Sequence, residues 1–112
     1  MRVAAVIADL MTYRRIEAAA AAAGASAVRV DSPDQLPRAA ELDLVLVDWA
    51  DRQDGWAESL AAWRGTQTAA KLVLFGPHVD LDAHADAKAA GLGPMWARSR
   101  LVRALPTLLQ SS

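Results

Sequence analysis

The stretch Leu44-Val45-Leu46-Val47-Asp48 decides the fold of this chain. Four consecutive aliphatic residues, with no polar residue between them, are typical of a strand that is covered on both faces of a parallel sheet. The carboxylate that ends the run then stands where the strand leaves the sheet. Short aliphatic runs of the same kind predict three further strands and a weaker fifth one, at residues 3–8, 27–30, 72–75 and 94–97.

Helical patterns occupy the intervals between these strands. We expect one helix over residues 12–23, ending before Gly24, and another over residues 55–64. Three more helices are predicted from first residues that are typical of helix N-termini: Ser32 followed by Pro33, Asp80, and Ser99. The helix at Ser32 must be short, because Leu42 already begins the next strand. Pro106 should kink or shorten the last of them.

The alternation of strands and helices predicts an α/β fold, a doubly wound, five-stranded parallel sheet of the (βα)5 type. Right-handed crossovers between parallel strands would place helices on both faces of this sheet. The chain has 112 residues, and neither a linker nor an internal repeat divides it. We therefore expect a single domain over residues 1–112.

The composition excludes several classes of function. Lys and Arg together number 12 and Asp and Glu 13, a balance that argues against a nucleic-acid surface. Cysteine is absent, which excludes a disulfide framework and a thiol nucleophile. The N-terminal segment does not have the pattern of a signal peptide, and no apolar stretch reaches the ~18 residues of a membrane span. We expect a cytoplasmic protein with no membrane partner.

Polar and charged residues follow the predicted strands. Asp9 follows the first strand and Asp48 the third, Gly76 and then His78 follow the fourth, and Arg98 follows the fifth. The carboxyl ends of parallel strands meet at one edge of a sheet, where doubly wound folds bind their ligands. Two carboxylates at this edge would suit a hard divalent cation such as Mg²⁺. His78 is expected to be a hydrogen-bonded loop residue rather than a catalytic one.

Two segments resemble the receiver domain of response regulators. Residues 6–16 (VIADLMTYRRI) are similar to its first strand and helix, and residues 44–49 (LVLVDW), followed by Asp54-Gly55, are similar to its phosphoacceptor strand and the turn after it. The spacing of all five strands agrees, and single-domain chemotaxis receivers are similar in overall layout. The resemblance implies the flavodoxin-like receiver fold, with Asp48 as the phosphoacceptor equivalent and Asp9 as an acid of the Mg²⁺ site.

The site that this resemblance implies is incomplete. Receivers place a second acid where this chain has Ala8, and a Thr or Ser where it has Gly76. They place a Lys, three residues after an aromatic switch residue, where this chain has Arg98 and Met95. Asp9, Gly76 and Arg98 are thus the equivalents of active-site residues, and no residue is assigned a catalytic role.

Arg98 is expected to interact directly with Asp48. A guanidinium is a planar fork of donors and does not replace a lysine ammonium conservatively. We expect a bidentate pair that neutralises Asp48 and fills the space left at Gly76. The loss of one acid should weaken metal binding at Asp9 and Asp48 without abolishing it, so we expect weak Mg²⁺ binding and no required cofactor.

Tryptophans and arginines are the candidate interface residues. Trp56 and Trp63 share a helical stripe with Leu60, which should pack mainly on the sheet. A partly exposed tryptophan of this stripe would anchor a partner. Trp96, Arg100 and Arg103 are further candidates, since they lie around the start of the last helix.

Three hypotheses for the function follow, in this order. The first is a pseudo-receiver, a non-enzymatic signalling module that binds proteins through an incomplete phosphorylation site. The second is a working single-domain receiver phosphorylated at Asp48 by a histidine kinase in a two-component phosphorelay. The third is a small flavodoxin-like enzyme or cofactor carrier, against which the turn after the first strand lacks a phosphate-binding pattern. Because the chain ends soon after its last helix, we expect no fused output domain, and we expect output through protein partners or a homodimer.

Overall fold

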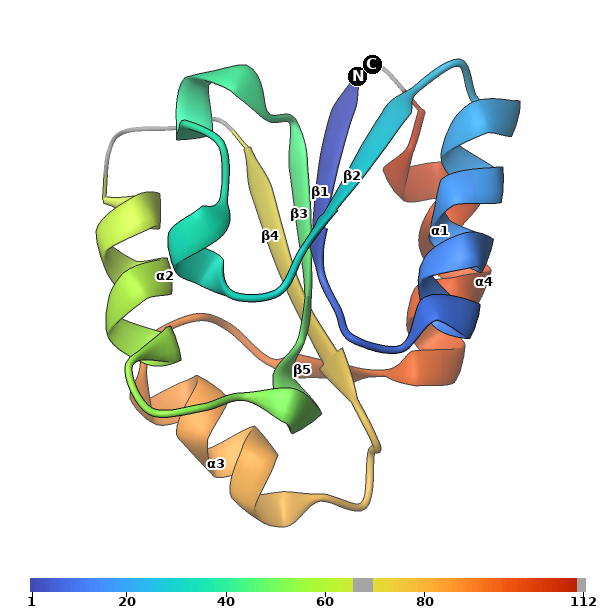
Figure 1. The fold of residues 1–112 in the computed structure, drawn as a ribbon. Coiled ribbons are helices and arrows are strands. Elements are labelled where there is room, and N and C mark those ends of the chain that lie inside the picture. The colour runs from blue at the N-terminus through green and yellow to red at the C-terminus, as the bar shows by residue number, and fades with distance from the viewer. Residues whose placement is uncertain (66–69, 111–112) are drawn as a thin grey trace.

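The computed structural model describes residues 1–65 and 70–110 of the chain. It contains five parallel strands in one sheet, in the order β2-β1-β3-β4-β5 (Figure 1). The predicted doubly wound parallel sheet is therefore confirmed. The strands are β1 (Arg2–Val6), β2 (Ser26–Val30), β3 (Leu44–Asp48), β4 (Lys71–Gly76) and β5 (Met95–Ala97).

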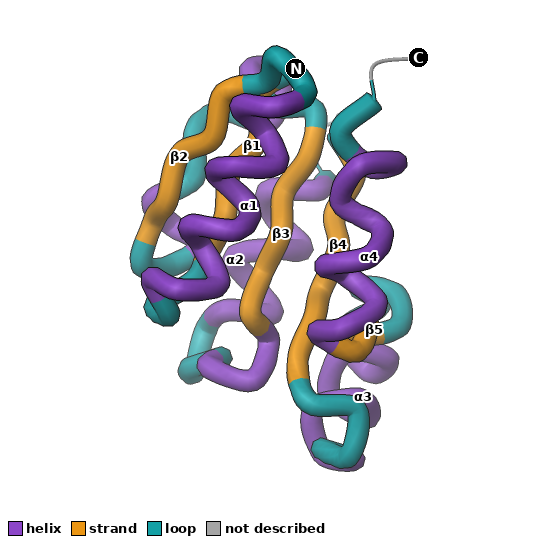
Figure 2. The backbone as a smooth tube through the Cα atoms, turned by 90° about the vertical axis from the view of Figure 1, so that its right-hand side faces the viewer, coloured by secondary structure: helices purple, strands orange, loops and turns teal. Residues whose placement is uncertain are grey.

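Helices cover both faces of the sheet. Figures 1 and 2 show α1 and α4 side by side on one face and α2 and α3 on the other. In the described ranges there are four α-helices, not the expected five, and none is long and apolar enough to cross a membrane. The helices are α1 (Leu10–Ala22), α2 (Trp56–Arg64), α3 (Leu81–Ala89) and α4 (Arg98–Leu108), and the 3₁₀ turns are η1 (Pro33–Gln35), η2 (Ala39–Glu41) and η3 (Trp49–Asp51).

The short helix predicted to start at Ser32 is a single 3₁₀ turn, η1, and not an α-helix. Pro33 occupies the first helical position as expected, but the Ser32 side chain makes no capping hydrogen bond. Leu36 is extended, with φ −63° and ψ 140°. It precedes Pro37, whose ring disfavours the helical conformation in the residue before it. A second proline therefore stops this helix after one turn.

The start of α4 also differs from the prediction. Ser99 is not its N-cap: the helix begins at Arg98, and the extended residue before it, Ala97, offers no side-chain cap. Pro106 lies inside α4, which ends two residues later at Leu108. The expected shortening is thus modest, because a proline in the last turn removes few hydrogen bonds.

The two cores follow from the alternation of side chains along the strands. Val45 and Val47 of β3 point to the α2/α3 face, and Leu44 and Leu46 point to the α1/α4 face. All five residues of β3 are buried. The edge strand β2 has no fully buried residue, so the prediction of cover on both of its faces is wrong.

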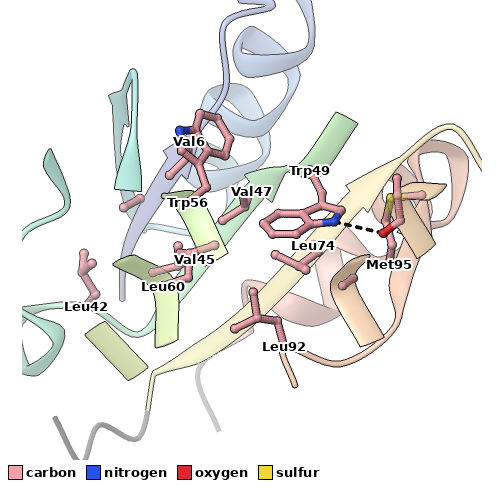
Figure 3. Packing of buried hydrophobic residues seen from close by; sticks show 13 residues of the cluster. Val6, Leu42, Val45, Val47, Trp49, Trp56, Leu60, Leu74, Leu92 and Met95 are labelled. Carbon is pink, nitrogen blue, oxygen red and sulfur yellow. Dashed lines mark hydrogen bonds between the residues drawn. The ribbon is translucent and has the colours of Figure 1, made fainter. Parts of the chain in front are cut away.

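Trp49, the residue after β3, anchors α3 against the sheet. Its ring is buried, and its Nε1 donates a hydrogen bond of 3.0 Å to the carbonyl oxygen of Ala83 in α3 (Figure 3). Arg52 adds a second link between η3 and α3, since its Nε lies 2.9 Å from Asp86 Oδ2. Nothing in the local sequence pairs these residues, which are 34 positions apart.

Asp80 is a true N-cap and provides a test of the fold. Its Oδ1 accepts a hydrogen bond of 3.0 Å from Ala83 N. We expect Asp80→Ala to lower the free energy of unfolding by about 1 kcal/mol, because the first turn of α3 loses this acceptor. Urea denaturation measures the change. Asp80→Asn is the control, since asparagine caps equally well, and an equal loss in both variants would contradict the capping role.

Candidate functional site

Asp48 lies at the buried carboxyl end of the central strand. Its side chain falls on the α1/α4 face, in phase with Leu44 and Leu46, and is only 2% exposed. The neighbouring strands β1 and β4 end on either side of it. A carboxylate in this position needs a partner, because the burial of an unpaired charge is strongly unfavourable.

Arg98 supplies that partner from the first residue of α4. Its Nη2 donates to Asp48 Oδ2 at 3.1 Å, and its Nη1 lies 3.9 Å from Asp9 Oδ2. The predicted convergence of Asp9, Asp48 and Arg98 at one edge of the sheet therefore occurs. The expected bidentate pair does not form, because the guanidinium bridges two carboxylates and makes one hydrogen bond to Asp48.

This bridge leaves two buried polar atoms without hydrogen-bond partners in the described structure. They are Asp48 Oδ1 and Arg98 Nε. The pair is thus only partly satisfied, although the guanidinium carbon also lies 5.9 Å from the ring centroid of Phe75. Unsatisfied buried atoms of this kind are uncommon in protein interiors and mark the site as under strain or as a place for a small ligand.

Asp9 has a structural role that the sequence reasoning missed. It is the N-cap of α1: Oδ1 accepts from Met11 N at 3.0 Å and Oδ2 accepts from Thr12 Oγ1 at 2.7 Å. The helix was expected to begin at residue 12, whereas it begins at Leu10. The spacing of Asp9 and Thr12 was the available signal, since an acidic N-cap bonds the second and third residues of its helix.

The two carboxyls have opposite pKa shifts. Burial raises the pKa of Asp48 above its ordinary value of 3.8, and the nearby Asp51 charge raises it further, against the opposing effect of Arg98. The hydrogen bond from the Thr12 side chain holds the pKa of Asp9 below its ordinary value, with smaller contributions from backbone N–H groups and Arg98. Asp9 is therefore the more acidic of the two.

Gly76 and its surroundings differ from the expectation. A Cβ built on Gly76 would lie 3.0 Å from Met95 Sδ and 3.4 Å from Ala50 Cβ. The thioether of Met95, not the guanidinium of Arg98, thus occupies the space beside Gly76. The prediction that Arg98 fills this space is wrong, because Gly76 faces the α2/α3 side of the sheet, with Leu74, while Asp48 faces the other side.

The residues present do not fit a magnesium ion well. Both oxygens of Asp9 already accept hydrogen bonds, and a guanidinium lies against Asp48. A bound cation would be repelled by Arg98, and Ala8 offers no further oxygen ligand. In the described part of the chain, no group of three or more His, Cys, Asp or Glu side chains is arranged to hold a metal.

His78 does not join the cluster around Asp48 through any contact that the structure records. Its backbone carbonyl oxygen lies 3.0 Å from His84 Nε2, an interaction within the loop and the start of α3. His78 is thus an exposed loop residue, and the expected hydrogen bond of its imidazole stays a prediction.

The tryptophans of α2 are mostly covered. Trp56 is 7% exposed and belongs to the core between the sheet and α2 (Figure 3), so it offers little surface to a partner and is wrong as an exposed anchor. Trp63 is partly buried against the same core, and its Nε1 donates to Pro37 O at 3.1 Å. The stripe therefore packs on the sheet, as the helical spacing predicts.

The other interface candidates lie on the opposite side of the molecule. Trp96 of β5 is partly exposed, with the guanidinium of Arg100 only 4.1 Å and the ammonium of Lys71 5.9 Å from its ring centroid. Arg100 and Arg103 are exposed on α4. The start of α4 thus presents exposed basic side chains beside a partly exposed aromatic ring.

The sheet order, the helical layers and an acidic residue at the end of β3 define the receiver fold. Among solved structures, the chain is similar to a response regulator from Thermotoga maritima, with a TM-score of 0.68 and 16% identity over 98% of both chains. It is similar to a response regulator receiver domain from Clostridium thermocellum, with a TM-score of 0.65 and 13% identity over 96% of this chain and 93% of that one.

A response regulator receiver protein from Burkholderia phymatum gives a TM-score of 0.64 and 18% identity over 99% of this chain and 97% of that one. No protein-family model matches the chain, and no curated protein matches it. At these identities the likeness is one of fold, so the chain has the receiver fold.

The Arg98–Asp48 interaction can be tested through stability. We expect Arg98→Ala to lower the free energy of unfolding by about 1–3 kcal/mol, less than for a fully buried pair, because the Arg98 side chain is 41% exposed. The loss arises because Asp48 is left buried and unpaired. Asp48→Asn combined with Arg98→Ala should recover part of it, as urea denaturation would show. Arg98→Ala with wild-type stability would contradict the pairing.

The raised pKa of Asp48 predicts a pH dependence. The native state binds the Asp48 proton more tightly than the unfolded chain does, so stability should fall as the pH rises from about 3.8 through the raised pKa. Asp48→Asn should remove this fall, and Asp51→Asn should reduce it by removing a like charge. Urea titrations from pH 3 to 7 measure the effect, whose slope is about 1.4 kcal/mol per proton and pH unit. A wild type that gains stability relative to Asp48→Asn across this window would contradict the assignment.

Proposed function

We propose that this chain is a pseudo-receiver, a non-enzymatic signalling module that binds other proteins and does not cycle phosphate at Asp48. The receiver fold supports a signalling role in general terms. The observation that carries the proposal is the contact of 3.1 Å between Arg98 Nη2 and Asp48 Oδ2. A carboxylate held by a guanidinium is a poor nucleophile toward phosphorus, since part of its charge is already neutralised.

The surroundings of Asp48 give a second line of support. Phosphoryl transfer depends on metal ions and hydrogen-bond donors placed around the developing charge. Around Asp48, Ala8 supplies no second acid for a metal and Gly76 supplies no hydroxyl donor. We propose that the chain requires no cofactor and binds Mg²⁺ only weakly through Asp9 and Asp48.

Exposed apolar side chains around the same edge support a protein partner. Met11, at the start of α1, is 77% exposed, and Leu81, at the start of α3, is 76% exposed. These helices follow β1 and β4, the two strands that flank β3, so the apolar residues lie on both sides of the Asp48 edge. Large exposed apolar side chains that gather at one edge are typical of an interaction surface.

The remaining parts of the proposal concern partners and location. A histidine kinase or another signalling protein would be the partner, in the cytoplasm. We further propose that a homodimer would form through the surface made by α3, β5 and α4. Trp96 and Arg100 lie on this surface, stacked against each other, and would contribute an aromatic and a charged contact.

One observation favours the alternative, a working receiver that is phosphorylated at Asp48. Asp48 Oδ1 has no hydrogen-bond partner among the described residues. A free carboxylate oxygen is what an attack on phosphorus needs, and Arg98 would then act as the cation that stabilises the phosphoryl group. The choice between the two hypotheses therefore depends on whether Oδ1 is reactive while Oδ2 is held.

An amide NMR titration, first with Mg²⁺ and then with acetyl phosphate, tests the proposal. We expect no sub-millimolar Mg²⁺ binding and no phosphorylation of the wild type, because Arg98 competes for Asp48. Arg98→Lys should gain measurable uptake, since the ammonium does not form a planar fork. Arg100→Lys is the matched control, because Arg100 lies on Trp96. Rapid uptake by the wild type that is lost in Asp48→Asn would favour the working receiver.

A further inference from the structure

The helical layer formed by α1 and α4 carries an excess of positive charge. α1 and α4 together carry five arginines and one glutamate, a formal charge of +4. The whole chain has a net charge of −1, so the rest of it carries −5. Such a separation creates a positive field over the α1/α4 face, which attracts negatively charged partners.

A pocket of about 510 Å³ lies in the seam between α1 and α4. The two helices run side by side there, as Figure 2 shows. Three arginines line it together with a serine and a valine, and much of the lining surface is apolar: Arg15, Arg98, Ser99, Val102 and Arg103.

The arginines of this pocket differ in their contacts. The guanidinium of Arg98 is committed to Asp48 and Asp9. Arg15 and Arg103 are exposed, and within residues 1–65 and 70–110 neither has a carboxylate at ion-pair distance or a hydrogen-bond acceptor. Two guanidiniums from different helices therefore face one pocket with their donors available. Guanidinium donors form their strongest hydrogen bonds with carboxylate and phosphate oxygens.

We propose that the pocket between α1 and α4 binds an acidic segment of a partner protein through Arg15 and Arg103. This inference rests on the proposed protein-binding function and names the chemistry of the partner. A segment with several carboxylates fits better than a single phosphate group, because the two available guanidiniums, Arg15 and Arg103, come from different helices. Val102 adds an apolar wall suited to the stem of an acidic side chain.

The first turn of α4 adds a hydroxyl group to this pocket. Its N-cap, Ala97, has no side chain that can accept a hydrogen bond, so no side chain caps the N–H groups at this end of the helix. Ser99, in the same turn, lines the pocket. These groups support the arginines and share their preference for an anionic ligand.

Binding of a hexaglutamate peptide to the full chain tests the inference. We expect Arg15→Ala and Arg103→Ala each to weaken the affinity roughly three- to tenfold, as is typical for the loss of one charge-assisted contact. Arg14→Ala is the matched control, because it removes the same charge from the neighbouring position of α1 without removing a pocket residue. Its effect should stay below about twofold, since screened charges outside the contact contribute little. Amide NMR shifts should centre on the pocket.

Three results would overturn the inference. Equal losses in Arg14→Ala and Arg15→Ala would mean attraction by net charge alone. Inorganic phosphate that binds the pocket as tightly as the peptide would replace the acidic segment by a phosphate ligand. Self-association at low salt, lost in Arg15→Ala and seen by sedimentation, would make a second copy of the chain the occupant. Since Arg15 and Arg103 do not contact Asp48, the acetyl phosphate assay fails or succeeds independently of these outcomes.

Discussion

The central strand β3 is buried at all five of its positions, and its last residue is a carboxylate. An aliphatic strand in the middle of a parallel sheet requires cover on both faces, which α1 and α4 provide on one side and α2 and α3 on the other. The same burial places Asp48 where water cannot solvate it. Arg98, at the start of α4, supplies a positive charge beside this buried carboxylate. Asp48 therefore belongs both to the buried central strand and to the candidate site.

Arg98 compensates the buried charge of Asp48 only in part. The guanidinium is shared between Asp48 and Asp9, and one oxygen of Asp48 stays without a hydrogen bond in the described structure. Burial and the charge of Asp51 outweigh the effects of Arg98 and of the Ala50 backbone on Asp48, which is why its pKa is raised. The pseudo-receiver and the working receiver differ in how this remaining oxygen is used.

The two faces of the sheet differ in packing and in charge. On the α2/α3 face, Trp49 follows Asp48 directly and ties α3 to the end of β3 through Ala83, and the thioether of Met95 packs beside Gly76. These contacts hold the β4–α3 region close to the core. On the α1/α4 face, the arginines remain largely solvated. An anchored, neutral face and a positively charged face would together suit a protein that acts through contacts with partners.

The sequence by itself determined the five strands, the class of fold and the apolar stripe of α2, because hydrophobic periodicity is a local property of the chain. It also determined the convergence of Asp9, Asp48 and Arg98, because the carboxyl ends of parallel strands lie at one edge of the sheet. It failed for the helix at Ser32, where Pro37 overrides a favourable start, and for the N-cap of α4. Only the tertiary structure decided that Arg98 bridges two carboxylates and that Met95 rather than Arg98 lies beside Gly76. These outcomes depend on distances between residues that are far apart in the chain, and on which face of the sheet each side chain points to.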